Sequence, residues 1–430
     1  MPTDPRGLRR NGDFLRLWTA GTISVFGSLI TRTALPFAAI LVLGAGPLEI
    51  AGLRSLELVA ALVVGLAAGA WVDRLRRRPV MIVADLGRAL LLGSIPVAAV
   101  AGSLGIGQLF VVAFLAAILT TFFDLADRSY LPAIVEPRQL VAANGALTTS
   151  ASAAEFTAFG IGGFLIQLFS APIAIGVDAV SFLASAVLLG SIRRPEPPRP
   201  AAEDRQPILR EIRHGLSLVG GSPVLRAIAG ASAAAHVLWG VFGTTYLLFA
   251  THDVGLGPAT IGVIAGLGGA GSLVGAVLAE RAVRRLGLGR TLLLGMIGFT
   301  AGSAFIPLAP SGAIVLGAAC LAAQQLIGDT FATAYDVVEV SLRQSIVADE
   351  NLGRVNGTIR FTTVLFQLAA TIGGGLIAES LGLRAAMALG LGGGIVAIGF
   401  VWFSPIRSMR VAPPATGQAL LPGEEMPLTE

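Results

Sequence analysis

Twelve apolar segments, most of them about 20 residues or longer, follow one another along this chain. An α-helix of about 20 residues crosses the ~30 Å hydrocarbon core of a bilayer, whereas barrel strands are about half as long and alternate polar with apolar residues. The sequence therefore predicts an all-α membrane protein with twelve transmembrane helices. The predicted spans are 17–43, 50–72, 79–100, 104–123, 145–168, 171–190, 224–250, 258–279, 290–309, 313–335, 355–379 and 383–403.

Composition excludes several classes of protein. Charged residues make up 13% of the chain, against about 25% in soluble domains. Cys320 is the single cysteine, so no intrachain disulfide or cysteine zinc cluster can form. All basic residues are arginine, which removes the lysine of a P-loop and that of a Schiff base. We expect neither an enzyme nor a bound cofactor.

The arginines are concentrated on one side of the predicted spans. That side holds 25 of the 30 arginines, counted over both tails and the loops 72–79, 124–144, 191–226, 280–290 and 336–354. Cytoplasmic loops carry this excess, so both termini are predicted to be cytoplasmic and the protein to lie in the plasma (inner) membrane. The net charge of +4 is spread over short loops, and we expect no nucleic-acid partner.

The two halves of the sequence resemble one another at an offset of 212 residues. Ser129 matches Ser341, and Asn144-Gly145 matches Asn356-Gly357. Six spans in each half would insert both halves the same way up, as in transporters built from parallel repeats. Helical spacing of apolar residues after a proline-rich stretch indicates a short amphipathic helix, or a plain solvated one. The predicted parts are an N-terminal half (1–192), a linker (193–223), a C-terminal half (224–404) and a cytoplasmic tail (405–430).

Residues 69–78, GAWVDRLRRR, resemble the G-x-x-x-D-R-x-G-R-R signature between spans two and three of the major facilitator superfamily. Leu131-Pro132, Asp178–Phe182 and Gly353–Val355 are similar to the branch that holds siderophore, macrolide and drug exporters. The resemblance implies two pseudo-symmetric six-helix halves and secondary transport by alternating access. One departure is that residues 158–163 read AFGIGG where drug–proton antiporters usually carry G-P-x-x-G-G.

The resemblance also implies a cytoplasmic gate. Asp73 ends a helix, where its carboxylate is unfavourable unless it caps the start of another helix. The alternative is that the loop arginines only set the topology. The predicted gating residues are Asp73, Arg74, Arg77, Arg78, Asp124, Asp127, Glu280 and Arg354.

The fifth predicted span (145–168) contains a candidate proton-coupling carboxylate, Glu155. Arg32 of the first span (17–43) is its predicted counter-charge. Each charge costs roughly 2.5–3.5 kcal/mol near the bilayer centre if alone, so each needs a partner or water. The residue equivalent to Glu155 in the second half is Gln367, which has the same shape without the charge. The alternative is a static ion pair that joins spans one and five.

Polar and aromatic residues in the second half are candidates for a substrate cavity, although lipid-facing or core positions are equally compatible with their spacing. The candidate cavity residues are His236, Trp239, Tyr246, Gln325, Asp329 and Gln367.

From these features we expect a monomeric, proton-coupled exporter of a small amphipathic compound, such as a drug-like molecule or a siderophore. Its partners would be that substrate, protons and the lipid bilayer. Uptake or facilitated transport of a nutrient is the nearest alternative, and a non-transporting receptor is a weaker one, because the loops opposite the arginine-rich side are short.

Overall fold

The computed structural model describes residues 8, 10–72, 75–194, 196 and 208–411. Every regular element in these residues is helical, which confirms the predicted all-α fold. Eleven helical segments among them are long and apolar enough to cross a membrane. A further helix, α3 (Pro47–Val72), has 26 residues and is consistent with the predicted twelve spans. The protein is a multi-pass membrane protein.

Contacts divide the chain into two compact units. Unit 1 covers residues up to 201 together with 247–267, and unit 2 covers 202–246 together with 268 onwards. Each unit is a bundle of long helices that are apolar on most of their surface, as expected for helices that pack in lipid.

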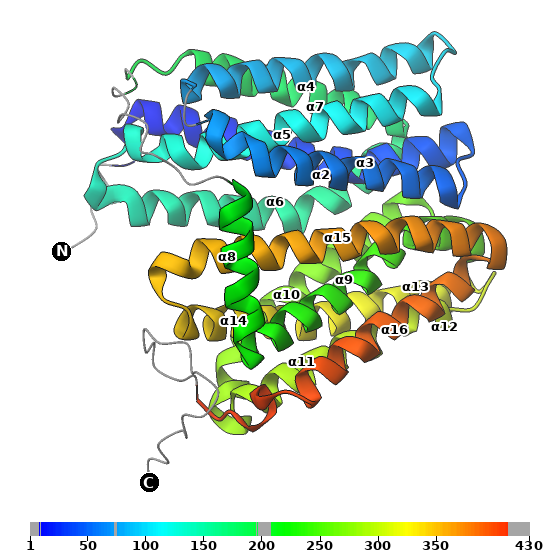
Figure 1. The fold of residues 1–430 in the computed structure, drawn as a ribbon. Coiled ribbons are helices and arrows are strands. Elements are labelled where there is room, and N and C mark those ends of the chain that lie inside the picture. The colour runs from blue at the N-terminus through cyan, green and yellow to red at the C-terminus, as the bar shows by residue number, and fades with distance from the viewer. Residues whose placement is uncertain (1–7, 9, 73–74, 195, 197–207, 412–430) are drawn as a thin grey trace. The chain divides into compact units, whose positions relative to one another are not determined.

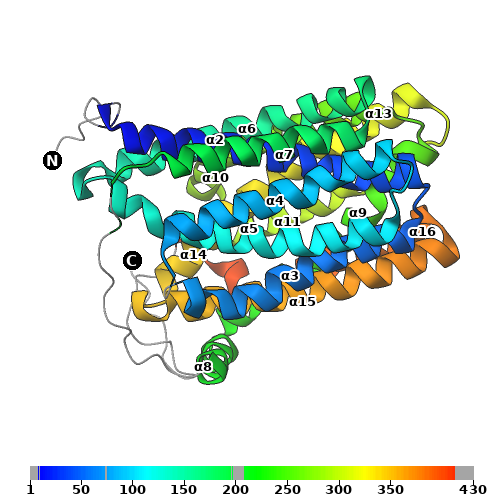
Figure 2. The same cartoon turned by 90° about the horizontal axis from the view of Figure 1, so that it is seen from above.

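Unit 1 contains six long helices. In addition to α3, they are α2 (Gly12–Phe37), α4 (Arg77–Val100), α5 (Ile106–Ile134), α6 (Leu140–Leu168) and α7 (Ala171–Gly190). Helix α7 packs along both α2 and α4, while α5 packs along α3 and α4, and α2 also contacts α6 (Figure 1). Figure 2 shows α3 and α5 running side by side. Small one-turn elements, η1 (Ala38–Val42) and η2 (Pro137–Gln139), extend α2 and precede α6.

Unit 2 repeats this plan with more interruptions. Its elements, beginning with the helix after the linker, are α8 (Ile208–Gly221), α9 (Pro223–Leu248) as far as residue 246, α10 (Pro258–Leu286) from residue 268, α11 (Leu288–Ser303), α12 (Phe305–Leu308), α13 (Ile314–Ala323), η4 (Gln324–Gly328), α14 (Asp329–Ile346), α15 (Asp349–Leu381), α16 (Leu383–Trp402) and η5 (Pro405–Ser408). Helix α9 continues as η3 (Phe249–Asp253), which is grouped with unit 1, as is the first part of α10. Helix α11 packs against α14 and α16, and α8 crosses α15 (Figure 1).

Two irregular turns lie next to candidate site residues. Pro36 cannot donate the hydrogen bond that an α-helix would give to the carbonyl of Arg32, and the π-helical turn η1 follows directly. The π-helical turn η4 ends at Gly328, immediately before Asp329. Such turns are frequent at functional sites because they redirect the side chains around them.

Glycines bring α10 and α11 close to η4. A Cβ on Gly271 would lie 2.8 Å from the carbonyl oxygens of Gln325 and Leu326, and one on Gly302 would lie 2.7 Å from the backbone of Gly328. Small residues at helix crossings are the usual means of tight packing in membranes. Gly271 and Gly302 therefore serve close helix packing.

Candidate functional site

Four charged side chains of unit 1 form one electrostatic group within the predicted membrane-spanning helices. They are Arg32 of α2, Arg54 and Glu57 of α3, and Glu155 of α6, and we name them the mid-membrane charge group. At 1.5 Å per residue, they lie roughly 10–20 Å along their helices from the ends at loop 43–46 and at Leu168. That depth is inside the hydrocarbon layer of a bilayer.

One direct ion pair holds part of this group. Arg54 Nη1 lies 3.1 Å from Glu57 Oε2, one helical turn away. Arg32 is attracted to both Glu57 and Glu155 and repelled by Arg54. Within the described residues, Arg32 and Glu155 make no direct ion pair. Arg54 and Glu57 are thus in direct contact, whereas Arg32 interacts with both carboxylates of the group over a longer range.

The group is accessible and incompletely satisfied. The side chains of Arg54 and Glu57 are 26% and 31% exposed, and Glu155 is exposed. Arg54 Nε and Ser55 Oγ are buried without a hydrogen-bond partner in the described part of the chain. Charges at this depth avoid lipid, so their exposure indicates a water-filled path or a binding site.

Sequence reasoning identified half of this group. It selected Arg32 and Glu155, and the structure places both in the same electrostatic group. It missed Glu57 and gave Arg54 no role. The available signal was the spacing of Arg54 and Glu57, three residues apart in an otherwise apolar helix, which favours an ion pair on one face.

A second charged group lies in the core of unit 1. Arg88 Nη2 is 2.5 Å from Asp85 Oδ1, and both side chains are almost fully buried, at 3% and 0% exposure. The guanidinium carbon of Arg88 lies 4.4 Å from the ring centre of Phe123 and 4.1 Å from that of Phe182. Aromatic faces on both contacts stabilise the cation where water is absent.

Asp178 of α7 extends this buried group. Its Oδ2 accepts a hydrogen bond from Thr31 Oγ1 at 2.5 Å, and its Oδ1 accepts one from Ser181 Oγ at 2.8 Å. Arg88 also attracts Asp178. The bond from Thr31 joins α2 to α7 in the centre of the unit, so these residues fix the packing of the bundle.

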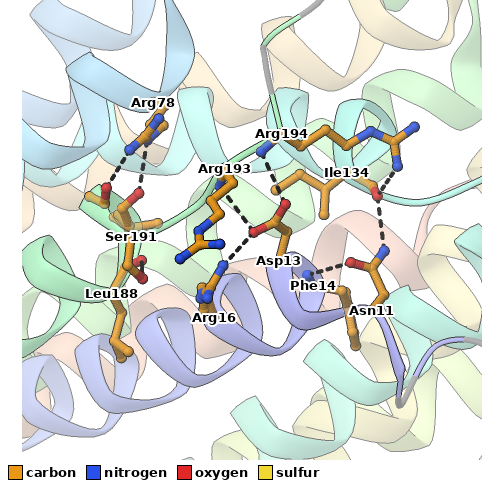
Figure 3. A network of polar contacts seen from close by, with 12 residues as sticks. Asn11, Asp13, Phe14, Arg16, Arg78, Ile134, Leu188, Ser191, Arg193 and Arg194 are labelled. Atoms are coloured by element: carbon orange, nitrogen blue, oxygen red, sulfur yellow. Dashed lines mark hydrogen bonds and ion pairs between the residues drawn. The ribbon is translucent and has the colours of Figure 1, made fainter.

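Hydrogen bonds between side chains and the backbone connect several elements at the end of unit 1 where α2 begins (Figure 3). Asp13 accepts hydrogen bonds from the backbone N–H groups of Arg193 and Arg194, both at 3.0 Å. The carbonyl of Ile134, at the end of α5, accepts bonds from Asn11 Nδ2 at 3.1 Å and from Arg194 Nη1 at 2.8 Å. These contacts, which we name the end clasp, join α2, α5 and the segment after α7.

The structure describes some of the predicted gating residues next to this clasp. Asp73 and Arg74 lie outside the described residues. The backbone N–H of Arg77 donates to both carboxylate oxygens of Glu196, at 2.9 and 3.1 Å. Arg78 donates to the last carbonyls of α7, with its Nε 2.9 Å from the carbonyl oxygen of Leu189 (Figure 3).

Two further gating candidates, Asp124 and Asp127, lie on α5 of unit 1. Asp127 interacts electrostatically with Asp124, Arg128 and Asp85.

In unit 2, Glu280 pairs with Arg284 one turn further along α10, and both are exposed. Arg354 Nη1 donates to Asn351 Oδ1 at 3.3 Å. The carbonyl of Arg354 lies against Gly215 of α8, where a Cβ would be 2.9 Å from its oxygen. A gating role for these residues stays a prediction.

Unit 2 brings three of the cavity candidates together. Tyr246 lies in the electrostatic field of Asp329, and Gly268 of α10 faces the side chains of both Asp329 and Gln325. Among the described residues, the buried hydroxyl of Tyr246 has no hydrogen-bond partner. A phenol, an amide and a carboxylate in one place can donate and accept hydrogen bonds from a polar ligand.

The remaining cavity candidates have local contacts. His236 Nδ1 is 2.7 Å from the carbonyl oxygen of Ser232, one turn earlier in α9. Trp239 stacks on Phe299, with ring centres 5.8 Å apart, and is 45% exposed. The carbonyl of Gln367 lies against Gly240, where a Cβ would be 2.5 Å from its oxygen. In the described residues, no three histidine, cysteine or acidic side chains gather as a metal site would need.

Comparison with protein families gives one match over most of the chain. The family model of the Major Facilitator Superfamily matches residues 17–344. The uncharacterized MFS-type transporter YfiS of Bacillus subtilis (strain 168) is 25% identical over 388 residues, which is 88% of this chain and 89% of that protein. The uncharacterized MFS-type transporter YceJ of the same organism is 27% identical over 231 residues, 54% of this chain and 56% of that protein.

Solved structures share the fold. A bacterial homologue of the iron transporter ferroportin in an inward-facing state matches with a TM-score of 0.72 and 18% identity, over 91% of this chain and 98% of that one. The nucleoside transporter NupG (D323A mutant) matches with a TM-score of 0.71 and 12% identity, over 90% and 98%. At these identities the likeness extends to the fold alone.

Proposed function

We propose a coupling mechanism for this chain from one premise, that it belongs to the Major Facilitator Superfamily and is a secondary transporter. The proposed function is proton-coupled export of a small amphipathic compound, such as a drug-like molecule or a siderophore. The observation that carries the proposal is the mid-membrane charge group, because its carboxylates are both deep in the membrane and accessible.

Charge balance within the group supports Glu155 as the coupling residue. Two arginines face two glutamates, so the group is neutral when both carboxylates are ionised. Arg54 and Glu57 neutralise one another through their direct contact. Arg32 and Glu155 interact electrostatically without a direct contact. Protonation of Glu155 therefore leaves the group with a charge of +1 and removes one of the two carboxylates that attract Arg32.

A proton and a substrate can compete for the same carboxylate. A substrate that carries a cationic or hydrogen-bond-donating group would bind ionised Glu155 from the cytoplasmic side. A proton entering from outside would neutralise Glu155, release the substrate and let the transporter return. This competition gives antiport, because a single carboxylate serves both ligands in turn.

Unit 2 offers candidate ligand-binding groups of its own. Tyr246, Gln325 and Asp329 offer hydrogen-bonding groups, and the stacked rings of Trp239 and Phe299 offer an apolar surface. An amphipathic substrate matches such a mixture of polar and aromatic side chains.

A susceptibility panel in an exporter-deficient bacterial host tests this function. Expression of the wild-type chain is expected to raise resistance to at least one amphipathic compound severalfold, and Glu155→Gln at equal protein level is expected to abolish that gain. Glu379→Gln, which changes an exposed carboxylate at the end of α15, is the matched control and should behave as wild type. Increased sensitivity on expression would indicate uptake instead, and would contradict export.

A further inference from the structure

A cavity at one end of unit 2 has a cationic lining that the transport mechanism does not use. It has a volume of about 510 Å³ and lies where α11 begins, α16 ends and η5 follows. Its lining is Arg290, Leu293, Trp402, Ser404, Arg407 and Ser408. Two of these six residues are arginines and none is acidic.

The cavity is held in shape by contacts between the chain after α16 and the start of α11. The backbone N–H of Leu288 donates to the carbonyl of Arg410 at 3.2 Å, and that of Gly289 donates to the carbonyl of Met409 at 2.9 Å. A Cβ on Gly289 would lie 2.8 Å from the carbonyl carbon of Arg407, so only glycine permits this approach. The two arginines are therefore presented by segments that are fixed to one another.

Positive potential converges on this cavity from three sources. Arg290 lies in the first turn of α11, a turn that contains no acidic residue, so the positive end of the helix dipole is not neutralised there. Arg407 lies over the ring of Trp402, with 3.8 Å from its guanidinium carbon to the ring centre. Stacking holds the guanidinium in place and leaves its N–H groups at the edge free to bind an anion.

The surroundings of the cavity match the headgroup level of a bilayer. Helices α11 and α16 are both membrane-spanning segments, and the cavity lies at the end where one begins and the other finishes. Trp402 is 41% exposed and Phe403 88%, as expected for aromatic residues at the membrane–water boundary. Leu294 and Ile297, about one and two turns after Arg290 on α11, are 45% and 38% exposed and offer an apolar surface.

We propose that this cavity binds the phosphodiester of an anionic phospholipid, with Arg290 and Arg407 on the phosphate and an acyl chain along α11. Arginine forms paired hydrogen bonds with phosphate oxygens. Basic cavities between helices at the membrane surface are suited to anionic headgroups. The hydroxyls of Ser404 and Ser408 line the same space and can bind the glycerol part of the headgroup.

Native mass spectrometry of the full-length protein tests the site, with phosphatidylglycerol as the probe and phosphatidylcholine as the neutral comparison. Each arginine near a membrane surface contributes about fivefold in affinity for anionic lipid, so Arg290→Gln with Arg407→Gln is expected to weaken the tightest phosphatidylglycerol binding about 30-fold. The control is Arg281→Gln with Arg285→Gln, which removes the same charge from exposed positions on α10 and should retain that binding.

Equal loss in both double variants, or equal binding of phosphatidylcholine, would overturn the proposal. Displacement of the lipid by inorganic phosphate at millimolar concentration would assign the cavity to a soluble anion instead, and would also overturn it. A second measurement needs no change to the arginines. With Trp18, Trp71 and Trp239 changed to Phe, the fluorescence of Trp402 is expected to be quenched more by phosphatidylglycerol with brominated acyl chains than by the matching phosphatidylcholine. Equal quenching by the two lipids would contradict the site.

Discussion

Two groups of charged residues inside the predicted membrane-spanning helices of unit 1 differ in their exposure. The Asp85–Arg88 pair is sealed between aromatic rings at 0–3% exposure, whereas Arg54 and Glu57 are about a quarter to a third exposed at similar depth. A sealed pair cannot exchange its ions or protons easily and serves packing, while an accessible group can bind them. We therefore expect the first group to stabilise the bundle and propose a coupling role for the second.

Removal of one member of the Asp85–Arg88 pair is expected to lower the stability of the folded protein. Arg88→Met leaves the carboxylate of Asp85 buried and unpaired, which costs roughly 3–5 kcal/mol. The measurement is the thermal unfolding temperature of the purified protein in detergent, followed by size-exclusion chromatography after heating. Arg281→Met, at an exposed position on α10, is the control and should unfold like wild type. An unchanged unfolding temperature for Arg88→Met would show that the pair does not stabilise the bundle.

At the scale of elements, helix ends were harder to predict than helix centres. The apolar run 104–123 predicted a span that stops before Asp124, yet α5 continues to Ile134. The helix extends because its last turns are amphipathic, with Phe123, Ala126 and Tyr130 buried at helical spacing while Asp124 is exposed. Apolar runs identify the part of a helix that lies in lipid, and helical periodicity is needed to find the rest.

The end clasp could not be predicted, because it depends on residues far apart in sequence. Asp13 accepts two backbone hydrogen bonds from the segment after α7, and nothing in the local pattern around Asp13 indicates this. A charged acceptor strengthens each such bond to roughly 1.5–3 kcal/mol. We expect the clasp to hold the end of α7 against α2 and α5.

Loss of the Asp13 carboxylate should therefore loosen this end of unit 1 locally. Asp13→Ala is expected to raise the hydrogen-exchange rates of the Arg193 and Arg194 amides roughly tenfold or more, while the helix centres keep their protection. Mass spectrometry with peptides that cover 188–196 reports this exchange. Arg16→Gln removes the side-chain partner of Asp13 but keeps both backbone bonds, so its exchange should match wild type. Unchanged exchange in Asp13→Ala would mean that other contacts hold the segment.

For the molecule as a whole, the repeat predicts the similarity of the two halves but not their difference. At the offset of 212, Asp124 corresponds to Asp336 and Asp127 to Glu339, so both halves carry an acidic pair near the same helix end. The mid-membrane charge group has no such copy, since Gln367 replaces Glu155. Comparison of the halves thus selects Glu155 as a candidate, whereas the electrostatic interaction of Arg32 with Arg54 and Glu57 of α3 emerges only from the structure.

The distribution of arginines predicts the membrane topology of the whole chain. With both termini and the linker in the cytoplasm, single cysteines at Ser103 and Asp253 should react with an impermeant maleimide added to intact cells, and one at Ala202 should not. Cys320→Ala supplies the cysteine-free background, because the chain has no other cysteine. Labelling at Ala202 with protection at Ser103 and Asp253 would reverse the orientation.

Proton coupling by Glu155 is tested most directly in proteoliposomes, with a substrate identified by the susceptibility panel. Two transport modes are compared for wild type and Glu155→Gln, namely accumulation driven by a pH gradient and exchange of substrate without a gradient. Because Gln keeps the shape of Glu and its amide oxygen still accepts a hydrogen bond from the substrate, but it binds no proton, gradient-driven accumulation should be lost while exchange continues with weaker substrate binding. Glu379→Gln should retain both modes. Accumulation by Glu155→Gln that equals wild type and still follows the pH gradient would contradict the mechanism.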